Sequence, residues 1–186
     1  MWSTGCLEGI KVNVTATKIK GAYIVERTPF TDERGYFVRA FCRKELGDAG
    51  MNADFVQSNI SGNHKKGTVR GMHAQKDGCE EEKLVGCTRG RMFDVCVDLR
   101  QDSDTYLQYV GVELSEENGK MLYIPKGCAH GYQTLEDDTQ AFYFATQYYA
   151  PGSEVGYGYD DPKFAIDWPI RDNLIVSEKD RNWERL

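Results

Sequence analysis

Two histidines stand in regularly spaced patterns that suit acid–base or metal chemistry. His130 closes the longer pattern, which reads Gly119-x5-Pro125-x-Gly127-x2-His130. His73 follows Gly67 after five residues. A neutral imidazole can accept a proton near pH 7 and is also the commonest metal ligand in proteins. The two histidines are therefore the first candidates for a reactive site.

Both patterns fit the two motifs that define cupin barrels. The His73 pattern corresponds to the first cupin motif, but it lacks the usual metal ligands. In the second motif an apolar strand precedes Pro125, Pro125-x-Gly127 makes the turn, and His130 points back into the barrel. In the first, Gln75 and Lys83 occupy the positions of a metal-binding histidine and glutamate. Glutamine and protonated lysine are poor ligands for transition metals. The spacing predicts a metal-free barrel with a cationic, histidine-containing cavity, and solvated polar side chains at the barrel mouth are the alternative.

Short strands are the elements that must position these residues. In residues 92–100, apolar side chains alternate with polar or small ones such as Asp94 and Asp98, which is the period of a β-strand. Helical patterns are confined to residues 44–49 and to a short C-terminal helix capped by Ser177. We predict an all-β fold, a cupin-type jelly-roll barrel with a few short helices, as one domain over residues 1–186. Further strands are expected at 23–25, 37–41, 83–87, 110–114, 121–124 and 141–146.

The composition excludes several classes of protein. The chain has 186 residues, of which 40% are hydrophobic and 28% charged, a mixture that suits one folded domain and not global disorder. A net charge of −6 argues against nucleic acid as a partner, and no apolar run approaches the ~18 residues of a membrane span. The first residues lack the basic and apolar regions of a signal peptide. The six cysteines form no Cys-x-x-Cys pair, so we expect reduced thiols in a cytoplasmic protein.

Short segments spread over roughly residues 18–181 carry a more specific likeness. They are FTDERGYF (30–37), QSNIS (57–61), KGTVRGMHAQ (66–75), KLV (83–85), FDV (93–95), VDLR (97–100), IPKGCAHG (124–131), YYAP (148–151), DP (161–162), IDWP (166–169) and SEKD (177–180). In these segments the chain resembles the dTDP-4-dehydrorhamnose 3,5-epimerase family, whose members are metal-free cupins. The resemblance implies a cofactor-free isomerase that acts on a nucleotide-linked 4-keto-6-deoxyhexose. The keto group acidifies the C–H bonds at C3 and C5, so epimerisation needs a base, an acid on the opposite face and a group that stabilises the enolate.

The same resemblance assigns catalytic roles to four residues. His73 resembles the family's base, and Asp180 matches the carboxylate that fixes its tautomer. Lys83 resembles the cation that stabilises the enolate oxygen, and Tyr143 the acid that reprotonates carbon from the other face. Tyr143 has an alanine two residues away on each side, so its face of the strand leaves room for a ligand. A solvated carboxylate, a surface lysine and a core tyrosine are the corresponding alternatives.

Further positions match the family's substrate-binding residues, among them arginines whose planar guanidinium suits a diphosphate. Two residues depart from the family pattern. Arg39 stands where the family commonly has an acidic residue that reaches the neighbouring subunit's nucleotide, and Ala74 replaces an aromatic residue, so the base and the sugar stay open. The matching residues are Arg34, Gln57, Asn59, Arg70, His130, Tyr149, Glu154 and Lys179.

A homodimer is also implied by the resemblance, with residues 22–41 contributing to paired edge strands. Two other functions stay open beside the 3,5-epimerase. One is a mono-epimerase or keto-isomerase that uses the same His73 on a related nucleotide sugar. The other is a non-catalytic sugar-binding cupin, although binding alone does not require His73, Lys83, Tyr143 and Asp180 together. A metal-dependent dioxygenase lacks its ligands.

Overall fold

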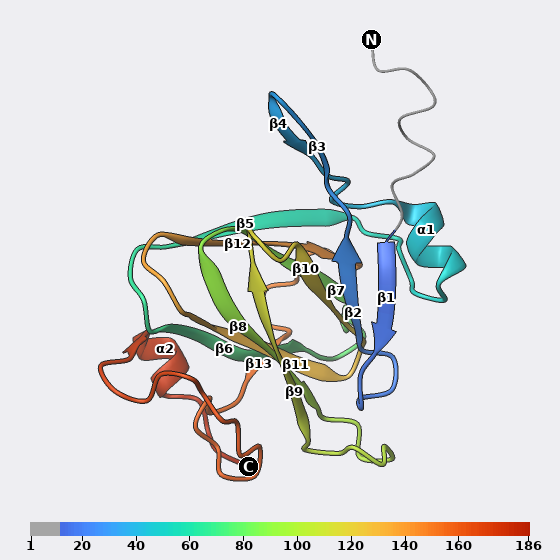
Figure 1. Ribbon diagram of the computed structural model, residues 1–186. Coiled ribbons are helices and arrows are strands. Elements are labelled where there is room, and N and C mark those ends of the chain that lie inside the picture. Colours follow the sequence, from blue (N-terminus) through green and yellow to red (C-terminus); the bar gives the residue numbers. More distant parts are fainter. Residues whose placement is uncertain (1–11) are drawn as a thin grey trace.

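Two sheets of antiparallel strands face each other in the computed structural model, which describes residues 12–186 (Figure 1). The first sheet has the order β1 (Val12–Ala16), β2 (Tyr23–Arg27), β10 (Lys120–Ile124), β7 (Lys83–Arg89), β12 (Thr139–Ala145) and β5 (Gln57–Asn63). The second has the order β13 (Glu154–Gly156), β6 (Thr68–Gln75), β11 (Cys128–Thr134), β8 (Arg91–Asp98) and β9 (Tyr109–Ser115). A short strand, β14 (Ile175–Val176), pairs parallel to β6.

Three smaller elements lie outside these sheets. The hairpin of β3 (Phe30–Asp32) and β4 (Gly35–Phe37) projects away from both sheets in Figure 1. Helix α1 (Arg43–Asp48) follows the hairpin, and helix α2 (Glu178–Arg181) lies near β6 at the other end of the chain. Strands therefore dominate the architecture, as the sequence predicted, and their two-sheet arrangement is the jelly roll.

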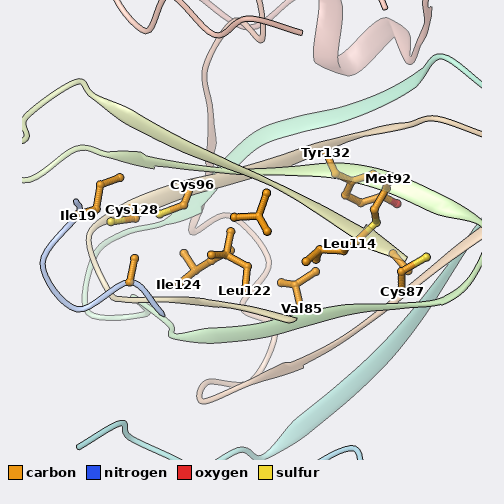
Figure 2. Packing of buried hydrophobic residues seen from close by; sticks show 13 residues of the cluster. Ile19, Val85, Cys87, Met92, Cys96, Leu114, Leu122, Ile124, Cys128 and Tyr132 are labelled. Carbon is orange, nitrogen blue, oxygen red and sulfur yellow. The ribbon is translucent and has the colours of Figure 1, made fainter. Parts of the chain in front are cut away.

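The core lies between the inner faces of the two sheets (Figure 2). Val85 and Leu122 from the first sheet pack into one cluster with Met92 and Leu114 from the second, and all four are fully buried. Removing a side chain of this size from water is worth about 1.5–3 kcal/mol. The cluster therefore holds the two sheets together.

Both outer faces of the barrel are also covered. Leu46 of α1 and Met51 pack against Phe142 on the first sheet, while Phe164 and Trp168 of the C-terminal segment cover the second. Strands covered on both faces lose the alternation of apolar and polar residues. Every residue of strand β11 is buried, and its sequence shows no such alternation. For this reason the strand was not predicted from the sequence.

Six predicted strands are confirmed within a few residues and correspond to β2, β7, β8, β9, β10 and β12. The prediction for residues 37–41 is wrong, because β4 ends at Phe37 and residues 38–42 form no strand. Those residues lead into α1, where Arg39 pairs with Glu45. The predicted helices correspond to α1 and α2, and the Ser177 hydroxyl caps α2 by accepting a hydrogen bond from the Asp180 backbone N–H.

Glycines let β6 and β11 approach closely enough to align the two histidines. Gly71 has φ +117°, and a Cβ there would lie 2.6 Å from the Cα of Gly131. Only glycine fits such a backbone contact with a positive φ. His73 and His130 are direct partners in the register of these strands. The turn before β11 follows the motif, since β10 ends at Ile124 and Gly127 has φ +77°.

Five cysteines are free thiols in the described residues, and Cys87, Cys96 and Cys128 are buried. Cys6, and the first eleven residues of the predicted domain, lie outside the described part of the chain. Within residues 12–186, no helix is both long and apolar enough to cross a bilayer.

Candidate active site

A pocket of about 140 Å³ lies between the two sheets and is lined by half of the predicted site residues. His73, Gln75 and Glu154 line it from β6 and β13, while Lys83 and Tyr143 line it from β7 and β12. A narrow extension past His73 and Lys83 reaches His130, Cys128 and Ile124. Gln57, Ala74, Glu81 and Tyr149 complete the lining.

His73 and Asp180 form a close pair at one wall of this pocket. The His73 Nε2 atom lies 2.6 Å from Asp180 Oδ1, and the two side chains are 28% and 6% exposed. Burial alone would raise the pKa of Asp180, but its hydrogen bond and charge interaction with His73 outweigh burial, and the pKa is lowered. An ionised carboxylate only accepts hydrogen bonds, so Nε2 carries the proton and Nδ1 keeps its lone pair. This tautomer makes His73 a base whose protonated form is stabilised from behind.

Several donors fix the Asp180 carboxylate from other directions. The Gly71 backbone N–H lies 3.4 Å from Oδ2, and the Trp183 indole N–H lies 3.3 Å from Oδ1. The cap by Ser177 positions the Asp180 backbone at the third residue after the cap. Asp180 is thus a buried and hydrogen-bonded group, and the alternative of a solvated carboxylate at a helix end does not hold.

Lys83 begins β7 and points into the pocket, where its side chain is 14% exposed. Its Nζ lies 3.0 Å from Glu81 Oε1 and 5.8 Å from the centroid of the Tyr143 ring. Residues two apart on an extended chain point to the same side, which places Glu81 and Lys83 in one pocket. The structure therefore places Lys83 in the pocket and not on the surface.

Tyr143 occupies the inner face of β12, opposite the face that carries Phe142 and Phe144. Ala141 lies in the core cluster between the sheets and Tyr143 packs against it, whereas the two phenylalanines join the cluster outside the first sheet. Burial raises the pKa of Tyr143, and the negative charge of Glu81 adds to the effect. The phenol therefore stays protonated near neutral pH, as a proton donor must.

His130 lies deeper, below the floor of the pocket. Its Nε2 atom is 2.8 Å from Oδ1 of Asp94, which is fully buried. Burial raises the pKa of Asp94 and the interaction with His130 opposes that shift. Oδ2 of Asp94 has no hydrogen-bond partner among the described residues. The pair resembles the His73–Asp180 pair, and in each pair the histidine lines the extension while the carboxylate does not.

Polar side chains gather at the pocket rim. The Gln57 amide oxygen accepts a hydrogen bond from the Tyr149 backbone N–H at 3.1 Å, and Tyr149 is 63% exposed. Asn59, next to Gln57 on the same face of β5, buries an amide nitrogen that has no partner among the described residues. Lys179 pairs with Glu154, which lines the pocket. The rim thus has one amide donor without a partner among the described residues, and a charged pair.

Two predicted arginines do not line this pocket in the described residues. Arg70 lies on β6 below His73, and its Nε donates to Asn63 Oδ1 at 2.8 Å. Arg34 lies at the tip of the β3–β4 hairpin beside Asp32, in a shallow hollow of about 210 Å³ lined by the hairpin itself. The hairpin projects from the barrel (Figure 1), and Arg34 in its turn lines the hollow of the hairpin and not the pocket.

Three residues near the site were not singled out from the sequence. Glu81 sits in an acidic run, but its spacing of two from Lys83 indicates a shared face. Asp94 takes a polar position in the alternation of β8, but the structure buries that position completely and pairs the carboxylate with His130. Trp183 follows Asp180 by three residues, but no pattern in the sequence indicates that its indole contacts the carboxylate.

Comparisons with known proteins converge on one family. A family model described as dTDP-4-dehydrorhamnose 3,5-epimerase matches residues 16–186. The dTDP-4-dehydrorhamnose 3,5-epimerase of Methanothermobacter thermautotrophicus is 45% identical over 172 residues, 91% of this chain and 92% of the relative. A dTDP-6-deoxy-D-glucose-3,5-epimerase from Legionella pneumophila, solved in complex with dTDP-4-keto-L-rhamnose, matches with TM-score 0.89 and 40% identity, over 94% of this chain and 92% of that one. A 3′-monoepimerase from Streptomyces bikiniensis, solved with dTDP-quinovose, matches with TM-score 0.85 and 28% identity, over 91% and 85% of the two chains.

Proposed function

Because this chain belongs to the dTDP-4-dehydrorhamnose 3,5-epimerase family, we propose that it epimerises C3 and C5 of a dTDP-linked 4-keto-6-deoxyhexose. The substrate is dTDP-4-dehydro-6-deoxyglucose and the product is dTDP-4-dehydrorhamnose. One observation carries this assignment. The base His73 is paired with the Asp180 carboxylate, and it shares a pocket with the phenol of Tyr143 and with Lys83.

Proton abstraction is the first step. The 4-keto group makes each neighbouring C–H acidic, and Nδ1 of His73 takes the proton to leave an enolate. The imidazolium that forms is stabilised by Asp180, 2.6 Å from Nε2. Because His73 is only 28% exposed, this charge interaction is weakly screened by water.

The enolate oxygen is stabilised by Lys83. A fixed cation beside developing negative charge lowers the barrier most in a site that excludes water, and the Lys83 side chain is largely buried. Tyr143 then delivers its proton to carbon from the face opposite His73, which inverts the carbon. The phenol is suited to this step because burial keeps it protonated near neutral pH.

The nucleotide binds at the polar rim. Asn59 offers a buried amide donor without a partner, and Gln57 and Tyr149 lie beside it. Arg70 does not line the pocket, but its positive charge acts on Tyr143, and its planar guanidinium suits diphosphate oxygens. Glu154 and Lys179 close the rim next to His73. A chain with a net charge of −6 must attract its anionic substrate through such local groups.

One experiment tests the assignment against its alternatives. The purified protein is incubated with dTDP-4-keto-6-deoxyglucose in deuterated water, and the sugar is analysed by mass spectrometry and NMR. Incorporation of two solvent deuterons with inversion at both carbons is expected. One deuteron would identify a mono-epimerase, and none would identify a binding protein. We expect the same incorporation when a chelator is present, because Gln75 and Lys83 replace metal ligands of the cupin pattern.

We also infer a homodimer. Strand β5 is one edge of the first sheet and β1 the other, so β2 is an inner strand and not the edge strand expected within residues 22–41; Ile60 of β5 is 70% exposed. The projecting hairpin exposes Phe30, Tyr36 and Phe37 at 43%, 62% and 41%. An exposed sheet edge with apolar side chains favours pairing with a second copy, which residues 22–41 would contact. Light scattering at micromolar concentration should give twice the mass of the chain, and Ile60→Asp should shift the protein toward a monomer.

The free thiols Cys87, Cys96 and Cys128 are typical of a reducing compartment, and we infer that the enzyme works in the cytoplasm. Cell fractionation tests this.

A further inference from the structure

Glu81 is a charged group in the pocket that the reaction as described does not use. Its side chain is 12% exposed, and its Oε1 lies 3.0 Å from the Nζ of Lys83. It lines both the pocket and the narrow extension below it. A carboxylate next to an anionic substrate opposes binding, so its presence beside the enolate-stabilising lysine calls for a role.

Glu81 differs from the two neighbouring glutamates in where its side chain lies. Three glutamates precede Lys83, and strand alternation separates Glu81 from the residues on either side of it. Glu82 turns to the opposite side, where it accepts a hydrogen bond from Asn52. Glu80 stays at the turn, with Oε1 3.4 Å from the Gly78 N–H. Of the three, Glu81 alone contacts Lys83 and the pocket.

A lysine needs such a contact because its side chain is flexible. The four-carbon stem samples many rotamers, and an ammonium has no preferred direction for its partners. Stabilising an enolate requires the cation to be in place before the charge develops. The ion pair with Glu81 removes that freedom in the free enzyme and keeps Nζ within 5.8 Å of the Tyr143 ring centroid.

We propose that Glu81 is a positioning residue that holds the Lys83 ammonium at the reacting face of the pocket. The inference rests on the proposed function, because Lys83 needs positioning only if an enolate forms. It predicts a split between the kinetic constants. Losing the tether lowers kcat, since the cation is no longer in place, while losing a negative charge leaves KM for an anionic substrate unchanged or lower. A merely structural role for Glu81 would not lower kcat and spare KM.

The test compares Glu81→Leu, Glu81→Gln and the control Glu80→Leu in the deuterium-exchange assay. Glu81→Leu should lower kcat by at least tenfold, on the scale that misplacement of a reacting group produces, without raising KM. Glu81→Gln keeps an oxygen that accepts from Nζ, so its kcat should stay within about threefold of wild type. Glu80→Leu should match wild type. Wild-type kcat in Glu81→Leu, or equal losses in both Glu81 variants, would overturn the proposal.

A second measurement needs neither substrate nor turnover. The rate at which an acetylating reagent modifies Lys83, followed by peptide mass spectrometry, should rise several-fold in Glu81→Leu and stay at the wild-type value in Glu80→Leu. An unchanged rate would show that Glu81 does not hold Lys83. If the wild-type protein exchanges no deuterium, the proposed function fails and this inference fails with it, whereas exchange in wild type with no effect of Glu81→Leu overturns the inference alone.

Discussion

The indole of Trp183 lies directly over Gly156, the residue that pairs with His73 across β13 and β6. A Cβ at position 156 would stand 2.0 Å from Cε2 of Trp183. The same indole donates its N–H toward Asp180 at 3.3 Å. The absence of a side chain at Gly156 therefore lets Trp183 reach the carboxylate that supports the base.

Replacing Gly156 with alanine should disturb this support. The added methyl must displace the indole, with an expected loss of about 1–3 kcal/mol in the free energy of unfolding. Because Asp180 then loses a donor, kcat should fall by about tenfold. Urea unfolding and the exchange assay measure the two effects. Gly47→Ala is the control, since a Cβ there meets nothing within 4 Å; a Gly156→Ala protein that behaves like this control would show that the indole is unimportant.

Removing the base and removing the acid should have different consequences. His73→Asn eliminates proton abstraction, so neither deuterium exchange nor epimerisation should occur. Tyr143→Phe keeps His73 and Lys83, so solvent deuterium should enter with retained configuration while inversion falls by about 10²–10⁴-fold. NMR of the sugar distinguishes retention from inversion. Wild-type exchange in His73→Asn, or inversion at the wild-type rate in Tyr143→Phe, would contradict the assignment.

Asp180→Asn should act as a weaker form of the His73 variant. An amide keeps the shape but can no longer stabilise an imidazolium, and its NH₂ group can donate to His73 and favour the wrong tautomer. Exchange and inversion should therefore fall together, unlike in Tyr143→Phe, where they separate. The measurement is the ratio of deuterium exchange to inversion in the NMR assay. If this ratio in Asp180→Asn equals that in Tyr143→Phe, Asp180 does not act through His73.

Lys83→Met should slow exchange of the substrate C–H by ~10²-fold or more, the scale observed when one oxyanion donor is removed. Methionine has a similar volume, so the thermal midpoint should change little. The exposed Lys44, which pairs with Asp48 on α1, supplies the control Lys44→Met. Unchanged turnover in Lys83→Met would mean that the lysine does not face the substrate.

The stability of the protein in acid should depend on Asp98. Burial would raise the pKa of this carboxyl, but hydrogen bonds from Arg100, Ser103 and Thr105 outweigh burial and lower the pKa. The stabilisation is therefore present above pH ~4, where the unfolded side chain is also ionised, and is lost as the pH falls below that value. Asp98→Asn should lose about 2–3 kcal/mol at pH 7 and clearly less near pH 2, which is closer to the lowered pKa of the folded protein. Urea unfolding at both pH values tests this, and a pH-independent difference would refute it.

Pattern and spacing in the sequence were enough to predict the all-β fold, because alternation marks strands that are polar on one face. Strands β8 and β9 were found in this way. Strand β11 was not, because every residue in it is buried and its sequence carries no alternation, and β6 was not, because its sequence, TVRGMHAQ, does not alternate either. The predicted strand at 37–41 failed for a related reason, since an apolar run alone does not reveal whether a neighbouring strand exists to pair with it.

The chemical types of the site residues were also determined by the sequence, since spacing and family motifs singled out His73, Lys83, Tyr143 and Asp180. What the tertiary structure decided is which of these groups meet. Asp180 lies 107 residues from His73 in the chain, and only the docking of the C-terminal segment on β6 brings them within 2.6 Å. The same folding placed Glu81 against Lys83 and left Arg34 outside the pocket. Contacts between distant segments depend on how covered faces pack, and no local pattern of residues encodes that packing.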